Sequence, residues 1–286
     1  MSLAYFNGRF VPVGQIALPL DDAGLVWGAT VTDRLRTFNG HLFALDAHLR
    51  RFYQSCELAR IPQLIPNAQL GRISERLVRD NRQGGEMSAI WIATPGPVSG
   101  AEVNPSPTLI AYTSPLDLRP FARQSREGAR LFPMSAGLGV DPRVKHRSRL
   151  PWWIARQQIL THDPLSEPLF VETGSDAVLE TPTANVLAVL DGTVVSPPRS
   201  RILGGVSLGV VEDLCRQLGL PFAEHPITLP DLARAAEVLL ANTTYCLAGV
   251  SRIADWPVPF PGPILNRLLD AWSKCVGVDI RGDMAG

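Results

Sequence analysis

Residues 144–149 read Val-Lys-His-Arg-Ser-Arg, and this stretch holds one of only two lysines in the chain. Lysine and arginine together number 27, so arginine supplies nearly all of the positive charge. A guanidinium stays protonated and is no nucleophile, whereas a lysine amine can lose its proton and form a Schiff base with an aldehyde. The other lysine, Lys274, has a structural explanation, because a cation suits the last turn of a helix predicted over Pro263–Val276. Lys145 has no such explanation, so we predict that it is a catalytic amine.

Composition argues against several classes of protein. At 286 residues the chain can form one large or two modest domains, and 45% apolar residues suffice for a buried core. A formal net charge of zero argues against a dedicated nucleic-acid binder. No signal peptide and no run long enough to span a membrane are visible. We therefore expect a cytoplasmic protein without a nucleic-acid or membrane partner.

The cysteines and histidines do not form a metal site or a disulfide framework in the sequence. No two cysteines form a CxxC pair, and the five histidines lack metal-ligand spacing. We expect no bound metal and a reducing compartment. The four cysteines are Cys56, Cys215, Cys246 and Cys275.

The first part of the chain combines short strands with two long helices. Asn7-Gly8 and Asn39-Gly40 are turn dipeptides between apolar runs, which predicts two β-hairpins. Apolar residues at helical spacing predict a helix from Leu45 to Ile61 and a second helix that Asn67 caps and that runs to about Asn81. Two more strands are predicted over Ser88–Thr94 and Thr108–Tyr112.

The second part again mixes strands and helices, without a regular β-α-β alternation. This order predicts an α+β fold and disfavours a Rossmann fold or a barrel. A proline-containing connection suggests a smaller N-terminal α/β domain over residues 1–115, a linker over 116–122, and a larger β-rich C-terminal domain over 123–286 that carries Lys145. The predicted strands are Pro168–Glu172, Ala177–Glu180, Asn185–Leu190, Thr193–Val195 and Glu237–Ala241, and the predicted helices are Trp152–Thr161, Val206–Gly219 and Leu229–Ala235.

Five motifs follow one another in an order that resembles the class IV (fold type IV) pyridoxal-phosphate enzymes. That family includes branched-chain aminotransferases, D-amino acid aminotransferases and aminodeoxychorismate lyase. The resemblance extends from the Asn7-Gly8 hairpin to about Val250, and it rests on the ordered set more than on any single motif. The motifs are His48-Leu-Arg-Arg51, Lys145, Glu180-Thr-Pro-Thr-Ala-Asn185, Ile202-Leu-Gly-Gly-Val-Ser207 and Ala241-Asn-Thr-Thr244.

The resemblance assigns a cofactor, pyridoxal 5′-phosphate, and a role to each motif. Lys145 would bind the aldehyde and later move a proton, and Glu180 would keep the pyridine nitrogen protonated. Asn185 would support the turn after Glu180. The phosphate would take its hydrogen bonds from arginine, from amides at a helix N-terminus and from hydroxyls. The residues implied for the phosphate are Arg51, Gly205, Val206, Ser207 and Thr243.

The substrate half of the implied site departs from the family pattern. Relatives often place Tyr or Phe where this chain has Thr32, and an arginine where it has Pro95. A cation for the substrate carboxylate would then come from Arg36, Arg147 or Arg149. Either of the last two would alternatively serve the 3′-oxygen of the cofactor.

The resemblance implies an aminotransferase that moves an amino group between an amino acid and a 2-oxo acid, as a homodimer. Two alternatives stay open at this point. One is a lyase like aminodeoxychorismate lyase, and the other is a catalytically degenerate protein that still binds the cofactor. The intact pair of Lys145 and Glu180 argues against degeneration.

Overall fold

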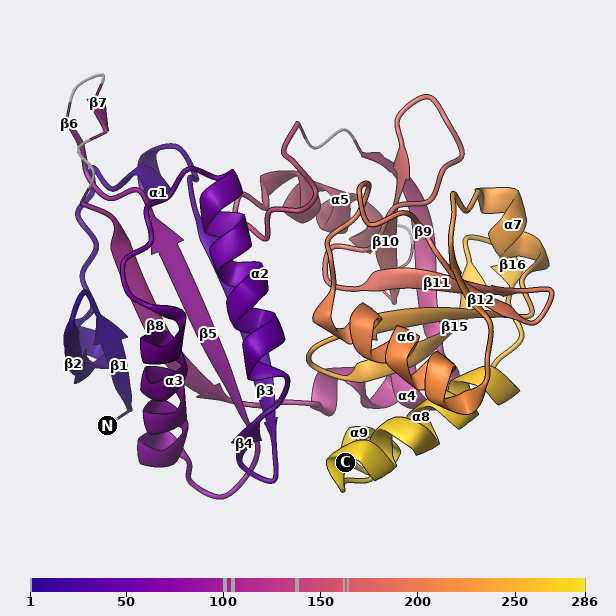
Figure 1. Cartoon of the computed structure of the whole chain (residues 1–286). Coiled ribbons are helices and arrows are strands. Elements are labelled where there is room, and N and C mark those ends of the chain that lie inside the picture. The colour runs from indigo at the N-terminus through magenta and orange to yellow at the C-terminus, as the bar shows by residue number, and fades with distance from the viewer. Residues whose placement is uncertain are drawn as a thin grey trace. The chain divides into compact units, whose positions relative to one another are not determined.

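The computed structural model describes residues 2–99, 102–103, 106–136, 139–161, 163 and 165–285 (Figure 1). It divides into two compact units. Unit 1 comprises Met1–Leu116 and Val144–Arg149, and unit 2 comprises Asp117–Arg143 and Leu150–Gly286. Lys145 was expected in the second domain, but its short segment packs with the first unit. The reason is a set of hydrogen bonds to unit 1 that are described below.

Unit 1 is built on a six-stranded sheet with strand order β2-β1-β8-β5-β3-β4. Neighbouring strands pair antiparallel along this path. A separate two-stranded ribbon joins β6 (Val98–Ser99) and β7 (Glu102–Val103). The strands of the main sheet are β1 (Leu3–Phe6), β2 (Arg9–Pro12), β3 (Val31–Phe38), β4 (His41–Leu42), β5 (Met87–Thr94) and β8 (Thr108–Pro115).

Both predicted hairpins of unit 1 are present, and their turns show why these dipeptides were decisive. Asn7 and Gly8 have φ of 43° and 92°, and Asn39 and Gly40 have φ of 53° and 81°. Asparagine and glycine tolerate positive φ better than other residues do, and tight hairpin turns need it at both central positions. The two short connections therefore fix the register of β1 with β2 and of β3 with β4.

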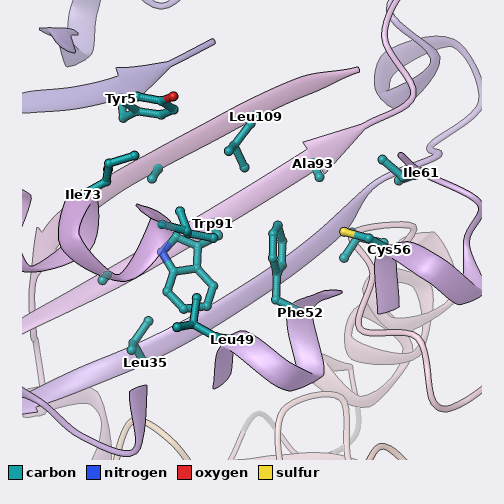
Figure 2. Close-up of a cluster of buried hydrophobic side chains, with 14 of the residues drawn as sticks. Tyr5, Leu35, Leu49, Phe52, Cys56, Ile61, Ile73, Trp91, Ala93 and Leu109 are labelled. Carbon is teal, nitrogen blue, oxygen red and sulfur yellow. The ribbon is translucent and has the colours of Figure 1, made fainter. Parts of the chain in front are cut away.

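Helices α2 (Leu45–Leu58) and α3 (Asn67–Asn81) lie against one face of this sheet (Figure 1). Figure 2 shows the core they enclose, where Trp91 of β5 packs edge-on against Phe52 of α2 with ring centroids 5.5 Å apart. The buried indole N–H of Trp91 donates to Ser74 Oγ on α3 at 2.8 Å, so its polar atom is satisfied. Burial of this apolar face holds α2 and α3 on the sheet.

Unit 2 contains an eight-stranded mixed sheet in the order β10-β9-β15-β14-β11-β12-β13, with β16 also paired to β15. β9 pairs parallel with both β10 and β15, and β14 pairs antiparallel with β11 and β15. The strands are β9 (Ala129–Ala136), β10 (Ser166–Glu172), β11 (Asn185–Leu190), β12 (Thr193–Ser196), β13 (Phe222–Glu224), β14 (Glu237–Asn242), β15 (Cys246–Ile253) and β16 (Trp256–Pro257).

Two longer helices of unit 2, α6 and α8, pack against β14 (Figure 1). Residues 177–180, expected as a strand, form only isolated β-bridges, at Ala177, Val178 and Glu180. The turn at Asp191 and Gly192 is present, with φ of 49° and 78°. The helices are α4 (Ala122–Glu127), α5 (Leu150–Leu160), α6 (Val206–Leu218), α7 (Leu229–Arg234), α8 (Pro263–Val276) and α9 (Ile280–Ala285), and unit 1 adds the short α1 (Ala23–Val26).

Candidate active site

The backbone of Lys145 is held on both sides by unit 1. Its N–H donates to Ser55 Oγ on α2 at 3.2 Å, and its carbonyl accepts from the N–H of Thr32 on β3 at 2.8 Å. Ser55 is fully buried and Lys145 is half-buried. Because this backbone is fixed, the side chain of Lys145 can adopt fewer positions. A restricted side chain suits a reactive group, which must approach its reaction partner in one geometry.

The segment after Lys145 lies beside the chain that enters β3. His146 forms a β-bridge with Val31, and the N–H of Arg147 donates to Thr30 Oγ1 at 3.0 Å. The hydroxyl of Ser148 donates to the carbonyl of Gly28, which has a φ of 65°. Gly28, which lies just before β3, thus contacts the lysine segment.

Arg51 forms a buried cluster with Asp33 and His48. Its Nε and Nη2 donate to the two carboxylate oxygens of Asp33 at 2.9 and 2.7 Å, which is a bidentate pair. Nδ1 of His48 lies 2.8 Å from Asp33 Oδ1, and since an ionised carboxylate can only accept, the imidazole donates. The guanidinium is therefore fixed in direction by an acid that the sequence analysis had not singled out.

The pKa values of this cluster follow from burial and charge. Burial would raise the pKa of Asp33, but the positive charge of Arg51 and the hydrogen bonds from His48 and Arg51 outweigh it and hold that pKa well below its usual range. Burial lowers the pKa of His48 despite the attraction of Asp33, so the imidazole is neutral at pH 7. The cluster thus contains one cation and one anion, and its net charge is zero.

The other candidates for substrate binding in unit 1 lie in different environments. Thr32 is buried and its hydroxyl donates to the carbonyl of Trp91 at 2.8 Å. Arg36 is also buried, with its guanidinium carbon 4.0 Å from the ring centre of Phe38. Arg149 is half-buried and donates from Nε to the carbonyl of His146 at 3.3 Å, whereas the side chain of Arg147 is exposed.

In unit 2, Glu180 is held by two donors. Its Oε2 accepts from Asn185 Nδ2 at 3.1 Å and from the N–H of Leu203 at 3.2 Å. Asn185 Nδ2 also donates to the carbonyl of Leu203 at 2.9 Å, so one amide side chain ties the carboxylate to the loop before α6. Hydrogen bonds of this kind stabilise the charged form of a carboxylate.

The loop before α6 requires glycine at its cap. A Cβ placed on Gly205 would lie 1.9 Å from Asn185 Oδ1, which no side chain can tolerate without movement. Gly205 is the N-cap of α6, followed by Val206 and the buried Ser207, and the first turn carries no acidic residue. The amides of this turn point out of the helix end, where an anion is favoured.

Thr243 lies half-buried in the turn between β14 and β15. Asn242 joins this turn to the one after Glu180, because its Nδ2 donates to the carbonyl of Thr183 at 3.0 Å. Three loops of unit 2 that were separate motifs in the sequence are therefore connected. Beside them lies a cavity of about 160 Å³ lined by Val140, Pro142, Phe170, Glu172, Leu179, Glu180 and Arg201.

Residues 30–253 match the sequence profile of the family described as amino-transferase class IV. The chain belongs to this family of enzymes, whose members depend on pyridoxal 5′-phosphate. It is 25% identical to a D-alanine aminotransferase of Staphylococcus aureus over 96% of this chain and 98% of that protein. A D-alanine aminotransferase of Bacillus licheniformis is 26% identical, over 95% and 96% of the two chains.

Solved structures show the same fold. The branched-chain amino acid aminotransferase of Escherichia coli aligns with a TM-score of 0.86 at 20% identity, over 96% of this chain and 94% of that one. The 4-amino-4-deoxychorismate lyase of Pseudomonas aeruginosa aligns with a TM-score of 0.79 at 28% identity, over 95% and 98%. The expected α+β, fold type IV architecture is confirmed.

Each unit by itself contains groups of the kinds that bind pyridoxal phosphate. Unit 1 provides a primary amine on a fixed backbone and an arginine fixed by Asp33. Unit 2 provides a carboxylate that accepts two hydrogen bonds, and a helix N-terminus with no acid in its first turn. Among the described residues no cluster of His, Cys, Asp and Glu suits a metal ion, and no helix there is long and apolar enough to cross a membrane.

Sequence reasoning missed three residues that position the candidate groups, namely Asp33, Ser55 and Leu203. Asp33 gave a signal, because a lone acid occupies the apolar, helix-facing side of a predicted strand. Ser55 follows Arg51 by four residues, which places both on one face of α2. Leu203 acts through its backbone N–H, and no sequence pattern reveals that.

Proposed function

We propose that this chain is a pyridoxal-phosphate-dependent aminotransferase that moves an amino group between an amino acid and a 2-oxo acid. The observation that carries the proposal is the placement of Lys145, one of two lysines, with its N–H and its carbonyl both fixed by unit 1. When bound, the cofactor supplies an aldehyde and an electron-withdrawing ring that stabilises negative charge at the substrate Cα. We also propose that the enzyme acts as a cytoplasmic homodimer.

Each residue has one task in this proposal. The amine of Lys145 holds the cofactor aldehyde and later carries the proton that leaves the substrate Cα. Glu180 faces the pyridine nitrogen and keeps it protonated. Arg51, whose direction Asp33 fixes, binds the phosphate together with the amides of Val206 and Ser207 and the hydroxyls of Ser207 and Thr243.

For the substrate carboxylate we propose Arg147. Of the three arginines considered, Arg36 is buried against Phe38, and Arg149 is half-buried with its Nε bonded to a carbonyl. Arg147 follows Lys145 by two residues and its side chain is exposed. A charged hydrogen bond to a carboxylate contributes about 1.5–3 kcal/mol, so its loss should weaken binding of every amino acid by at least about tenfold.

The test begins with attachment of the cofactor. Protein loaded with pyridoxal phosphate should absorb at the edge of the visible range, and borohydride should fix the label on Lys145 in a peptide map. Lys145→Arg should lose both the label and turnover, because a guanidinium cannot react with the aldehyde. Lys274→Arg is the matched control and should keep both. A label on Lys274 in the unmodified protein would contradict the proposal.

A lyase is the second candidate, since a lyase shares this fold at 28% identity. Titration of the loaded protein with single L- and D-amino acids separates the two reactions. An aminotransferase converts the cofactor to its amine form and stops until an oxo acid is added. A lyase releases pyruvate from its substrate without that net conversion.

A further inference from the structure

Two arginines lie side by side on neighbouring strands of unit 2. Arg130 of β9 and Arg252 of β15 are direct partners in the parallel pairing of these strands. Neighbouring strands lie about 4.8 Å apart, so both side chains leave the same face of the sheet within reach of one small group. Both residues are half-buried. Because like charges at such a distance repel each other, the pair by itself destabilises the sheet.

One carboxylate, that of Asp163, partly balances this pair. Nη2 of Arg252 donates to Asp163 Oδ2, and Ser166 Oγ donates to the same oxygen at 2.7 Å. The N–H of Leu165 donates to Asp163 Oδ1 at 3.0 Å. The hydrogen bond from Ser166 lowers the pKa of Asp163, and the charges of Arg252 and Arg130 lower it further, so the carboxylate is ionised at pH 7. The two arginines and this one acid together carry a net positive charge.

Asp163 does not use all the donors of the two guanidinium groups. Nε of Arg252 is buried, and it has no hydrogen-bond acceptor within the part of the chain that the structure describes. No hydrogen bond or ion pair to Arg130 is formed there either, and Arg130 acts on Asp163 only through its charge. A buried donor without an acceptor is costly, and a guanidinium pairs best with a planar or tetrahedral oxyanion. The arrangement therefore favours a further anion between Arg130 and Arg252.

An exposed aromatic ring lies next to this pair. Phe132 follows Arg130 by two residues on β9, so it lies on the same face of the strand, about 7 Å further along. Its side chain is 37% exposed, whereas Leu131 between them is fully buried on the other face. A ligand whose anion binds the arginines can therefore cover the ring of Phe132 with an apolar part, and this removes apolar surface from water.

We propose that Arg130 and Arg252 bind the carboxylate of a small organic acid, whose apolar part packs on Phe132. A carboxylate is favoured over a phosphate dianion, because one negative charge brings the two arginines and Asp163 to zero and leaves no uncompensated charge. None of the residues assigned to the cofactor or to the substrate takes part. The inference therefore does not depend on the proposed aminotransferase function.

The test titrates cofactor-loaded protein with phenylacetate at low salt and measures binding by calorimetry. Phenylacetamide, which has a similar shape without the charge, is the comparison. We expect the acid to bind at least about tenfold more tightly than the amide, the factor that one charged hydrogen bond contributes. Phenylacetate should also raise the melting temperature of the protein, because a ligand that binds only the folded state stabilises it.

Matched variants locate the bound acid. Arg130→Gln should bind phenylacetate at least about tenfold more weakly, and it should fold, because loss of its charge relieves the repulsion from Arg252. Arg126→Gln removes an exposed arginine of α4 and should change nothing. Phe132→Ala should weaken phenylacetate binding by at least about threefold, with the acid still preferred over the amide. Arg147→Met should keep this binding event, which separates it from the carboxylate site proposed for the substrate.

Equal affinity of Arg130→Gln and the unmodified protein for phenylacetate would overturn this inference. So would binding that is lost in Arg147→Met alone, because the acid would then occupy the substrate site. Tighter binding of phenyl phosphate than of phenylacetate would overturn the assignment to a carboxylate. If Arg130→Gln does not fold, Arg130→Lys decides, because it keeps the charge but not the paired hydrogen bonds and should bind more weakly than the unmodified protein. None of these outcomes alters the proposed aminotransferase function.

Discussion

Asp33 is the residue on which the arrangement of Arg51 and His48 depends. Asp33→Asn would leave the guanidinium of Arg51 buried without its counter-charge. We expect a loss of about 3–5 kcal/mol in the free energy of unfolding, measured by urea denaturation at pH 7. Asp80→Asn is the control, because the ion pairs of Asp80 with Arg76 and Arg79 are exposed, and it should cost less than about 1 kcal/mol. Equal losses of unfolding free energy in the two variants would show that Asp33 does not stabilise its cluster with Arg51 and His48.

The same cluster predicts how stability depends on pH. The pKa of Asp33 is lower in the folded protein than in the unfolded chain, so its contribution is complete above the unfolded value of about 3.9 and is lost as pH falls through the folded value. His48 is neutral when folded because its pKa is lowered, so protonation of the unfolded chain destabilises the fold below about pH 6.5. The free energy of unfolding should fall from about pH 6.5 downward, in two stages. His48→Gln should reduce the upper stage, and the remainder belongs to His146, whose pKa is also lowered by burial. An unchanged upper stage would contradict the assignment to His48.

Glu180 acts through its charge in the proposed reaction. Glu180→Gln keeps the size of the side chain and an oxygen that can accept from Asn185 and Leu203, but it removes the anion. We expect turnover to fall by at least about a hundredfold, the usual effect of removing one preorganised electrostatic partner. Equilibrium dialysis should show a much smaller change in cofactor affinity. Near-normal turnover would mean that Glu180 does not face the pyridine nitrogen.

The N-terminus of α6 depends on the absence of a side chain at Gly205. In Gly205→Ala the new Cβ would meet Asn185 Oδ1, so Asn185 must move and release Glu180 and Leu203. We expect at least about tenfold weaker cofactor binding, because both the helix end and the carboxylate lose their position. Gly204→Ala is a matched control, since nothing lies within 4 Å of its added Cβ. Equal affinity of the two variants would contradict this role.

Elements with a local signal were predicted from the sequence, and elements fixed by distant contacts were not. Hairpin turns and amphipathic helices carry their own patterns, and α8 matches the prediction at both ends. The strands β9 and β15 of unit 2 were missed. Pro133 interrupts the pattern of β9, and Gly249 weakens that of β15, where an added Cβ would lie 2.7 Å from the ring of Phe260. The reason for Pro133 and Gly249 at these positions is visible only in the packing of the folded unit 2.

The ends of the helices in unit 1 also could not be predicted from local sequence patterns. The helix expected to reach Ile61 ends at Leu58, because Arg60 takes a positive φ of 55° and Ile61 N–H donates back to the Cys56 carbonyl. Asn67 was expected to cap α3, but Pro66 is the N-cap and Asn67 is the first helical residue. In the candidate site, residue types that carry chemistry were visible in the sequence. The backbone groups that hold them, at Thr32 and Leu203, were not.

At the scale of the whole molecule, an apolar run in unit 1 favours self-association. Leu20, Leu25 and Trp27 are 85%, 61% and 55% exposed, although Asp22 between them is buried and bonded to Thr94 and Thr108 on the sheet. A fixed backbone that presents large apolar side chains to water is typical of an interface. This run supports the proposed homodimer.

The double variant Leu20→Glu, Leu25→Glu tests that interface. Burying a leucine contributes about 1.5–3 kcal/mol, so losing two should weaken dimerisation by at least about a hundredfold. Sedimentation equilibrium at micromolar concentration should then show a monomer, whereas the unmodified chain should sediment as a dimer. Leu58→Glu, at a 38% exposed position at the end of α2, is the control and should remain dimeric. Because the added charges lie on the surface, the monomer should keep its circular dichroism spectrum, and a variant that stays dimeric would show that the partner docks elsewhere.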